Sequence, residues 1–269
     1  MEIHETAVVK PGAKIAKGAK IGPYCVIGSR VEIGEGTVLF NHVTVAGNTT
    51  IGRNNKIYQN AVIGTWPQDI SFSGTDTRVV IGNNNVIREF VTIHCGTHKA
   101  DRVTRLGDGN YIMAYSHIAH DCEIGNGVIM ANGVQLGGHV KIEDYANVGG
   151  LAALHHFVTV GRLAFIGGLT RVVRDVPPFM TVEGNPSKVR CVNVVGCSRN
   201  GVSRDTIKKL KEAYRLLYRT QQPLRDAIVK LEKDNSAQEI GELIAFLRSS
   251  ARGKQGRARE ALRKQNGQA

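Results

Sequence analysis

The 269-residue chain is poor in aromatic residues and has no long apolar run, and both features limit what it can be. Phe, Trp and Tyr make up only 6% of it. No segment of about 18 consecutive apolar residues is present, which argues against a membrane-spanning helix. The five cysteines are scattered and form no C-x-x-C pair, so they favour reduced thiols over a disulfide framework or a zinc cluster. The first residues lack the basic and apolar regions of a signal peptide, and we expect a cytoplasmic protein without membrane insertion.

Glycine and positive charge are abundant. The 31 glycines suit many tight turns around a thin aliphatic core. The formal net charge is +12, and residues 199–269 carry most of it, with 17 Lys and Arg against 8 Asp and Glu. This basic region favours an acidic partner through electrostatic steering, although a charged, solvated face explains it equally well.

Aliphatic residues recur at every sixth position through the first two thirds of the chain. This period fits a short strand followed by a corner, and three such hexapeptides close one triangular coil that stacks by parallel pairing. We therefore predict an all-β fold over residues 1–190, a hexapeptide-repeat parallel β-helix, whose left-handed coil is carried over from known proteins of this kind. Polar stretches at 64–80 and 94–105 interrupt the repeat and are expected to be loop insertions that often form a binding site. The aliphatic series runs over Ile3–Ile63, Ile81–Ile93 and Leu106–Val172.

A small α-helical C-terminal domain is predicted over residues 191–248. Apolar residues at steps of three and four indicate helices that open near Ser203, Pro223 and Ser236. Ser236 and Glu239 have the spacing of a capping box. We expect these helices to cover the open end of the solenoid. The polar, basic residues 249–269 are expected to form a flexible tail.

The coil repeat places certain polar residues in one column. His120, Gly138 and His156 follow one another at intervals of three hexapeptides, so they fall at the same corner of successive coils. A histidine beside a glycine backbone suits a general base next to an oxyanion-binding amide. Asp121 follows His120 and could accept a hydrogen bond from its ring, which would fix the tautomer. Further histidines fall in the same stretch, namely His117, His139 and His155.

Several motifs occur in an order and spacing that resemble a known family. They are Ser116–Cys122, Leu136–Val140, Leu154–Phe157, Asp175–Pro178, Gly184–Pro186 and Arg199–Ser203. Through them the sequence resembles the UDP-N-acetylglucosamine O-acyltransferases, which carry out the first step of lipid A synthesis. The resemblance extends from residue 1 to about residue 248.

The resemblance implies a homotrimer with active sites in clefts between subunits. His120 would take the proton from the sugar 3-position, Asp121 would orient it, and the Gly138 amide would hold the oxyanion. The acyl donor would be a 3-hydroxyacyl thioester on the 4'-phosphopantetheine of acyl carrier protein, with no metal and no other cofactor. Substrate-binding roles would fall to Gln68, Asp69, His117, His139, His155, His156, Asn193 and Arg199, and Gly168 would set the acyl length.

Four positions differ from the residues of well-known family members. They are Ser71, His156, Val195 and Asn200, and all lie in the expected substrate region. The reaction would be kept, but the acceptor stays open between UDP-N-acetylglucosamine and its 3-amino analogue, which would give an amide.

Other functions remain as alternatives. One alternative is an N-acyltransferase of the same pathway. Those enzymes carry an extra domain before the repeats, whereas the repeat here begins at Ile3, which argues against this alternative. A γ-class zinc carbonic anhydrase would use His94, His117 and His120, but only two residues separate the last pair instead of four. A nucleic-acid binder is suggested by the pI of about 9.7 alone, because the basic tail lacks interleaved aromatics. A purely structural solenoid would not need the histidine column.

Overall fold

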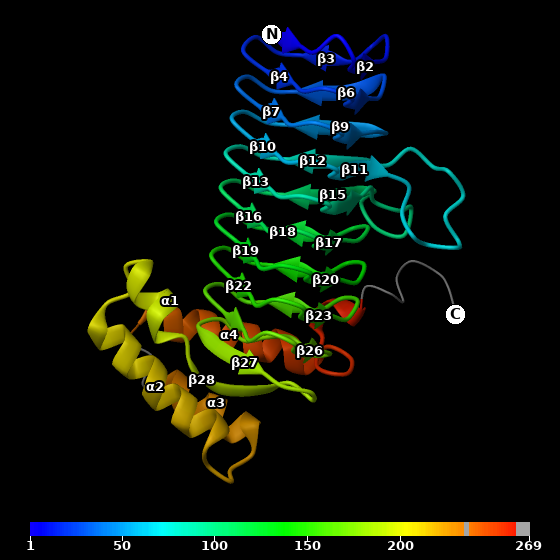
Figure 1. Cartoon of the computed structure of the whole chain (residues 1–269). Helices are drawn as coiled ribbons and strands as arrows, with labels where there is room; N and C mark the ends of the chain where they lie inside the picture. The colour runs from blue at the N-terminus through cyan, green and yellow to red at the C-terminus, as the bar shows by residue number, and fades with distance from the viewer. Residues whose placement is uncertain (234–236, 262–269) are drawn as a thin grey trace.

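The computed structural model describes residues 1–233 and 237–261, which form a stack of triangular coils followed by helices (Figure 1). Three sheets, with eleven, nine and eight strands, are the three walls of the stack. The first sheet contains β1 (Glu2–Ile3), β4 (Lys20–Ile21), β7 (Val38–Leu39), β10 (Lys56–Ile57), β13 (Val86–Ile87), β16 (Tyr111–Ile112), β19 (Ile129–Met130), β22 (Asn147–Val148), β25 (Phe165–Ile166), β27 (Met180–Glu183) and β28 (Lys188–Val192).

The other two walls are built only from parallel strands. The second sheet contains β2 (Val8–Val9), β5 (Val26–Ile27), β8 (Thr44–Val45), β11 (Val62–Thr65), β14 (Thr92–His94), β17 (His117–Ile118), β20 (Gln135–Leu136), β23 (Ala153–Leu154) and β26 (Arg171–Val172). The third contains β3 (Lys14–Ile15), β6 (Arg30–Ile33), β9 (Asn48–Ile51), β12 (Arg78–Ile81), β15 (Val103–Leu106), β18 (Glu123–Ile124), β21 (Lys141–Ile142) and β24 (Thr159–Val160). The predicted parallel β-helix is confirmed.

The strand register shows which coils are longer than three hexapeptides. Ile3 pairs with Ile21, as the repeat requires. Ile57 pairs with Ile87, and Ile87 pairs with Ile112. The two coils between these pairs therefore contain more residues than three hexapeptides supply. The extra residues leave the coil as two loops, 66–77 and 95–102, both at the corner between the second and third sheets. Both loops are shorter than the predicted insertions because strand pairing of β12 and β15 extends into the polar sequence.

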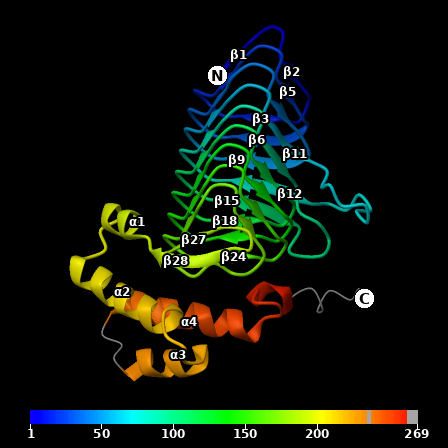
Figure 2. The ribbon, with the colours of Figure 1, turned by 60° about the horizontal axis from the view of Figure 1, so that its bottom comes forward.

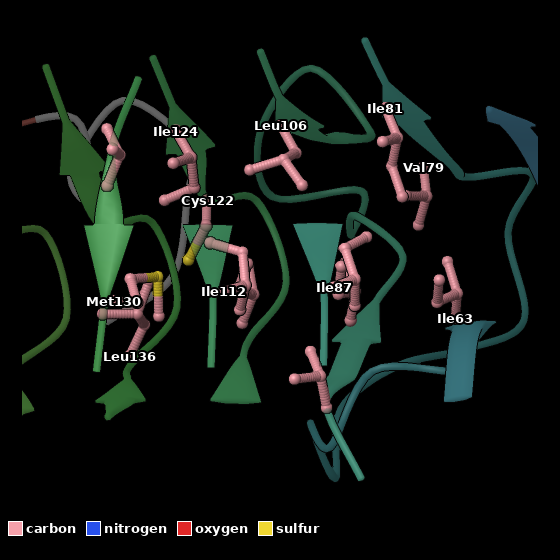
Figure 3. Close-up of a cluster of buried hydrophobic side chains, with 14 of the residues drawn as sticks. Ile63, Val79, Ile81, Ile87, Leu106, Ile112, Cys122, Ile124, Met130 and Leu136 are labelled. Carbon is pink, nitrogen blue, oxygen red and sulfur yellow. The ribbon is translucent and has the colours of Figure 1, made fainter. Parts of the chain in front are cut away.

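The core is a narrow column of aliphatic side chains that points into the coil. Ile87, Ile112 and Met130 are completely buried there, and Figure 3 shows neighbouring members of the column stacked coil upon coil. Full burial of one such side chain contributes about 1.5–3 kcal/mol relative to an exposed one. The sixfold aliphatic pattern is thus the pattern of the core.

A ladder of buried asparagines stabilises the corner between the third and first sheets. The Asn85 Nδ2 donates to Asn55 Oδ1 at 3.0 Å, and Asn110 Nδ2 donates to Asn85 Oδ1 at 2.9 Å. The backbone N–H of Val128 donates to Asn110 Oδ1 at 2.7 Å. These side chains satisfy backbone groups that the turns would otherwise leave buried and unpaired.

The C-terminal end of the solenoid is closed by a hairpin and helices. β28 pairs antiparallel to β27, and four α-helices follow in the part of the chain that the structure describes (Figure 2). They are α1 (Val194–Arg199), α2 (Arg204–Tyr218), α3 (Leu224–Lys233) and α4 (Gln238–Arg252). Their apolar faces form a second cluster with Leu163 and Phe179 of the last coils, so the helices cap the core as predicted. The sequence missed α1 and the antiparallel strand because both are short and lack a hydrophobic period.

Helix starts agree in part with the sequence signals. Ser203 is the N-cap of α2, and its side chain accepts from the Thr206 N–H. Helix α4 begins at Gln238 with Ala237 as its N-cap, which makes no side-chain capping bond. Ser236, the first residue of the predicted capping box, lies outside the described residues.

The expectation of a flexible tail from residue 249 is wrong for the part that the structure describes. Helix α4 continues to Arg252, and a 3-10 helix follows at Ala258–Ala261. The Ala258 N–H donates to Asp175 Oδ2 at 2.7 Å, and the Arg257 guanidinium donates to Val173 O at 2.6 Å. Hydrogen bonds to the last coils therefore hold residues 253–261 against the solenoid. Residues 262–269 lie outside the described residues.

Within the described part of the chain, no helix combines the length and the apolar character that crossing a membrane requires.

Candidate active site

The predicted column of site residues lies at the corner where both loops emerge. Ile118 pairs with Leu136, and Leu136 pairs with Leu154, in β17, β20 and β23. His120, Gly138 and His156 each follow two residues after one of these positions. The register thus confirms that the three residues occupy equivalent positions on successive coils.

His120 and Asp121 form a buried pair. The Nδ1 atom of His120 lies 2.8 Å from Oδ2 of Asp121, as the sequence predicted, and both residues are at least nine-tenths buried. Asp121 has φ of +59°, a left-handed conformation that aspartate tolerates better than most residues. With Nδ1–H donated to the carboxylate, Nε2 is the nitrogen that can accept a proton.

Gly138 lies directly against the His120 ring. A β-carbon at position 138 would come within 2.4 Å of Cε1 and 2.5 Å of Nε2, so only glycine leaves room for the ring. Among the described residues, the Gly138 N–H donates to no acceptor, while the Gly137 N–H donates to Leu154 O on the following coil and the His139 N–H to His120 O on the preceding one. An unused amide next to a buried histidine is suited to bind an oxyanion.

Asp121 is held, at its carboxylate and at its backbone N–H, by residues that the sequence did not indicate. Thr97 donates from its N–H to Oδ1 at 2.8 Å and from its hydroxyl to Oδ2 at 2.6 Å. Thr104 accepts from the Asp121 N–H at 2.9 Å. Both threonines belong to the second polar stretch, Thr97 in the loop and Thr104 on β15, but single threonines carry no motif that could have identified them.

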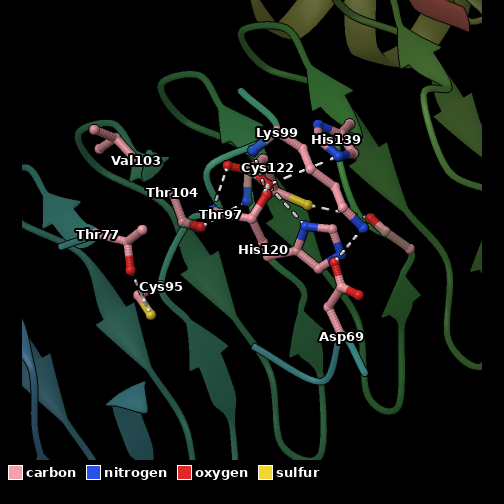
Figure 4. Close-up of polar contacts among 12 residues, drawn as sticks. Asp69, Thr77, Cys95, Thr97, Lys99, Val103, Thr104, His120, Cys122 and His139 are labelled. Carbon is pink, nitrogen blue, oxygen red and sulfur yellow. Dashed lines mark hydrogen bonds and ion pairs between the residues drawn. The ribbon is translucent and has the colours of Figure 1, made fainter. Parts of the chain in front are cut away.

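His139 lies beside His120 (Figure 4), and its ring also approaches Asp121. Its Nε2 is 3.7 Å from Oδ2 of Asp121, and its ring stacks on Phe157 with 4.4 Å between centroids. Burial lowers the pKa of His139 to about 4, against the attraction of Asp121. At neutral pH the ring is therefore uncharged, so one of its nitrogens donates a hydrogen bond and the other accepts one.

His117 and His94 lie one coil apart in the same wall. The His117 Nδ1 is 2.7 Å from the Thr92 hydroxyl, and the His94 Nδ1 contacts the carbonyl of Trp66. Burial, and then the neighbouring histidines, lower the pKa of His117 to about 4, and burial also lowers the pKa of His94. Both rings are thus uncharged at neutral pH.

Asp69 reaches the site region from the first loop. Its Oδ2 accepts from Lys99 Nζ at 2.8 Å, and its Oδ1 accepts from the N–H and the hydroxyl of Ser71. Burial opposes the charged form, but the bonds from Lys99 and Ser71 outweigh it and hold the pKa of Asp69 well below its usual range. Gln68, next to it, is exposed. Lys99 is a further charged residue that the sequence did not single out.

His155 and His156 lie on the coil that follows Gly138. Their rings meet edge to face with 5.5 Å between centroids, and His155 Nδ1 lies 3.1 Å from the His156 carbonyl. His156 is exposed, so it can contact a bound molecule.

Three predicted site residues lie elsewhere in the chain. Gly168 is at the corner between the first and second sheets. A β-carbon at this position would lie 3.3 Å from the carbonyl oxygen of Gly150. Asn193 is the N-cap of α1, and Arg199 is its exposed last residue. In Figure 1, α1 and the two loops lie on opposite sides of the solenoid. One chain therefore does not bring these residues to His120. The exposed Val195 and Asn200 lie with Asn193 and Arg199.

One group of described residues has ligand atoms close enough to hold a metal ion, namely His120, Asp121 and His139. Both Asp121 oxygens already accept hydrogen bonds there. The zinc alternative needs His94, His117 and His120, and the geometry does not group these three.

Two family models and several relatives match the sequence. Residues 175–254 match the model described as UDP N-acetylglucosamine O-acyltransferase, domain 2, and residues 1–34 and 104–138 match the bacterial transferase hexapeptide repeat. The chain is 50% identical over 253 residues to a Thermodesulfovibrio yellowstonii protein, covering 94% of this chain and 98% of the relative. It is 45% identical to a Synechocystis relative, covering 78% and 75%. Both relatives are named acyl-[acyl-carrier-protein]–UDP-N-acetylglucosamine O-acyltransferase.

Solved structures resemble the whole fold. The UDP-N-acetylglucosamine acyltransferase of Francisella novicida has a TM-score of 0.88 at 42% identity, covering 91% of this chain and 90% of that one. LpxA from Bacteroides fragilis, also a UDP-N-acetylglucosamine acyltransferase, has a TM-score of 0.89 at 34% identity, covering 91% and 96%. The likeness includes both the solenoid and most of the helical cap.

Proposed function

The chain belongs to the UDP-N-acetylglucosamine O-acyltransferase family, and from that premise we propose how its residues carry out the reaction. The fold is the predicted left-handed β-helix with a helical cap. The activity is transfer of an acyl group from acyl carrier protein to UDP-N-acetylglucosamine, the first step of lipid A biosynthesis. The transferred group is a 3-hydroxyacyl chain, and the acceptor atom is the sugar 3-oxygen.

The observation that carries this proposal is the His120–Asp121 pair against Gly138. His120 Nε2 removes the proton from the sugar 3-hydroxyl as its oxygen attacks the thioester carbonyl. Asp121 holds the ring through Nδ1 and stabilises the imidazolium that forms. The Gly138 N–H donates to the oxyanion of the tetrahedral intermediate. The proton on Nε2 then passes to the departing phosphopantetheine thiolate, which restores the base.

The remaining predicted residues bind substrates in this proposal. His117, His139, His155 and His156 line the column around the base, and Asp69 and Gln68 contact the sugar from the first loop. Asn193 and Arg199 contact the phosphopantetheine and nucleotide ends, and Gly168 limits the acyl chain. The reaction needs a base and an oxyanion donor, so no metal and no further cofactor are assigned.

A trimer would complete the site. Gly168, Asn193 and Arg199 are separated from His120 within one chain, so a neighbouring copy must supply them if they act together. The corner between the first and second sheets carries a column of exposed apolar side chains, which suits contact with another copy. Its members are Tyr24, Phe90, Tyr115, Leu151 and Leu169.

The acidic carrier protein would approach the basic C-terminal helices. Helix α2 alone carries Lys208, Lys209 and Lys211 in its N-terminal half. A positive surface raises the rate of encounter with an acidic partner and makes it dependent on ionic strength. We place the enzyme in the cytoplasm, together with its carrier protein, and not within the membrane.

Competition between acceptors tests the function. The purified protein is incubated with a panel of 3-hydroxyacyl carrier proteins, UDP-N-acetylglucosamine and its 3-amino analogue in equal amounts, and the products are separated by mass. Preferred transfer to the hydroxyl sugar supports the proposal. Preferred transfer to the amine would instead make the chain an N-acylating variant and account for Ser71, His156, Val195 and Asn200. Transfer to neither would contradict the assignment.

A further inference from the structure

The second loop contributes a threonine that is fully buried against the catalytic carboxylate. Thr97 is 0% exposed and donates to both oxygens of Asp121, at 2.8 and 2.6 Å. Hydrogen bonds to an ionised acceptor are short and strong, and two from one residue fix the plane of the carboxylate. Oδ2 also accepts from the His120 ring. Thr97 therefore determines where the partner of the base points.

The same loop reaches the first loop two residues further on. The Lys99 N–H donates to the Thr97 hydroxyl oxygen at 3.2 Å, and its Nζ donates to Asp69 at 2.8 Å. The Lys99 and Asp69 side chains are 28% and 12% exposed, so the ion pair is largely shielded from water. Salt screens a partly buried pair of this kind much less than an exposed one. Figure 4 shows the Lys99 side chain extending toward Asp69.

These contacts form one continuous path. It runs from Asp69 through Lys99 and Thr97 to Asp121 and His120, and every step is a hydrogen bond or an ion pair. The path joins the loop expected to contact the sugar with the pair expected to remove its proton. Such supporting contacts decide whether catalytic groups are held in productive geometry.

We propose that Thr97 and Lys99 are positioning residues of this enzyme. Thr97 fixes Asp121 so that it holds His120 in the Nδ1–H tautomer, and Lys99 fixes Asp69 for the sugar nucleotide. The proposal rests on the proposed function for its kinetic consequences. Because the two residues act on different partners, loss of Thr97 impairs the chemical step, whereas loss of Lys99 impairs acceptor binding.

Substitution of Thr97 tests the first half. Thr97→Val keeps the shape but removes the hydroxyl, and kcat is expected to fall roughly tenfold or more, since orientation of the base is part of its effect. Nitrogen NMR of the His120 ring should show a shift from one tautomer toward a mixture. Thr97→Ser restores the hydroxyl and should recover both. Thr49→Val is the matched control, because Thr49 is equally buried but donates to the Ala46 carbonyl.

Substitution of Lys99 tests the second half. Lys99→Met should raise KM for UDP-N-acetylglucosamine roughly tenfold while kcat stays within about threefold, as expected for loss of binding common to ground and transition states. Lys99→Arg should restore most of the affinity. The exposed Lys56, which lies on β10, gives the control Lys56→Met.

The two proposals can be told apart. Affinity for UDP-N-acetylglucosamine by calorimetry and the His120 tautomer by NMR do not require turnover. If the wild-type protein transfers no acyl group but both measurements respond as expected, the positioning roles stand and the function fails. If the wild-type protein is active and Thr97→Val keeps its kcat and tautomer, or Lys99→Met keeps its KM, the positioning role of that residue is wrong.

Discussion

The ring of His120 lies against the α-carbon of Gly138, one coil away, with room for a hydrogen there but not for a methyl group. A β-carbon at 138 would fall 2.4 Å from the ring. The stack of coils produces this contact directly, because the two residues follow equivalent core positions, Ile118 and Leu136. The repeat that builds the core thus also brings the base and the oxyanion donor together.

Gly138→Ala is expected to displace the His120 ring and reduce kcat roughly 100-fold, close to the effect of losing the base. The coil should remain folded, because movement of the His120 side chain can relieve the clash. Steady-state kinetics and thermal unfolding would be measured together. Gly150→Ala is the control, since its β-carbon would meet nothing closer than 3.4 Å. Full activity in Gly138→Ala would contradict the contact.

Gly168→Met is expected to shift acyl preference toward shorter chains. Gly168 is exposed within one chain, so a larger side chain there fills the space that a neighbouring copy would enclose. Relative kcat/KM for carrier proteins with acyl chains of increasing length measures the shift. An unchanged order of preference would show that Gly168 does not limit the acyl chain.

Stability should depend on the neutral state of His139. Its pKa is about 4 in the folded protein, below the ordinary value of about 6.5 expected on unfolding. Between these values the unfolded chain binds more protons, so the free energy of unfolding falls as pH is lowered from 6.5 toward 4, and this contribution is flat above that range. His139→Phe keeps a ring on Phe157 and removes this titration. Denaturant unfolding at several pH values should give a shallower decline for the variant; an identical decline would contradict the assignment.

The segment after α4 is expected to depend on a buried ion pair. The Arg257 Nε donates to Glu260 at 2.7 Å, and both residues are more than nine-tenths buried. Breaking a buried pair costs about 3–5 kcal/mol. Arg257→Met should therefore accelerate hydrogen exchange at the Ala258 N–H by roughly two orders of magnitude, whereas the exposed Arg252→Met should not. Unchanged exchange in Arg257→Met would show that the segment is held by other contacts.

The repeat made most of the fold predictable. Aliphatic residues at every sixth position determine coil length and register, and register alone places His120, Gly138 and His156 together. The same reasoning failed in the segments that carry no hydrophobic repeat. Helix α1, the antiparallel β28 and the segment around Arg257 are held by tertiary contacts, and a basic, glycine-containing sequence does not reveal them.

The sequence predicted the residues of the catalytic pair but not the residues that hold them in place. His120 and Asp121 are adjacent in sequence, so their contact follows from a short turn. Thr97 and Lys99 are distant from Asp121 in the sequence, and they reach its surroundings because an insertion folds back along the corner. Loop conformation has no simple pattern in the sequence, so the positioning residues required the structure.

The most direct test of the central claim is acyl transfer by His120→Ala. We expect the wild-type protein to acylate UDP-N-acetylglucosamine from a 3-hydroxyacyl carrier protein. The variant should lose about 100-fold or more in kcat while it binds the sugar nucleotide with similar affinity. A variant that keeps its rate would contradict the assignment of His120 as the general base.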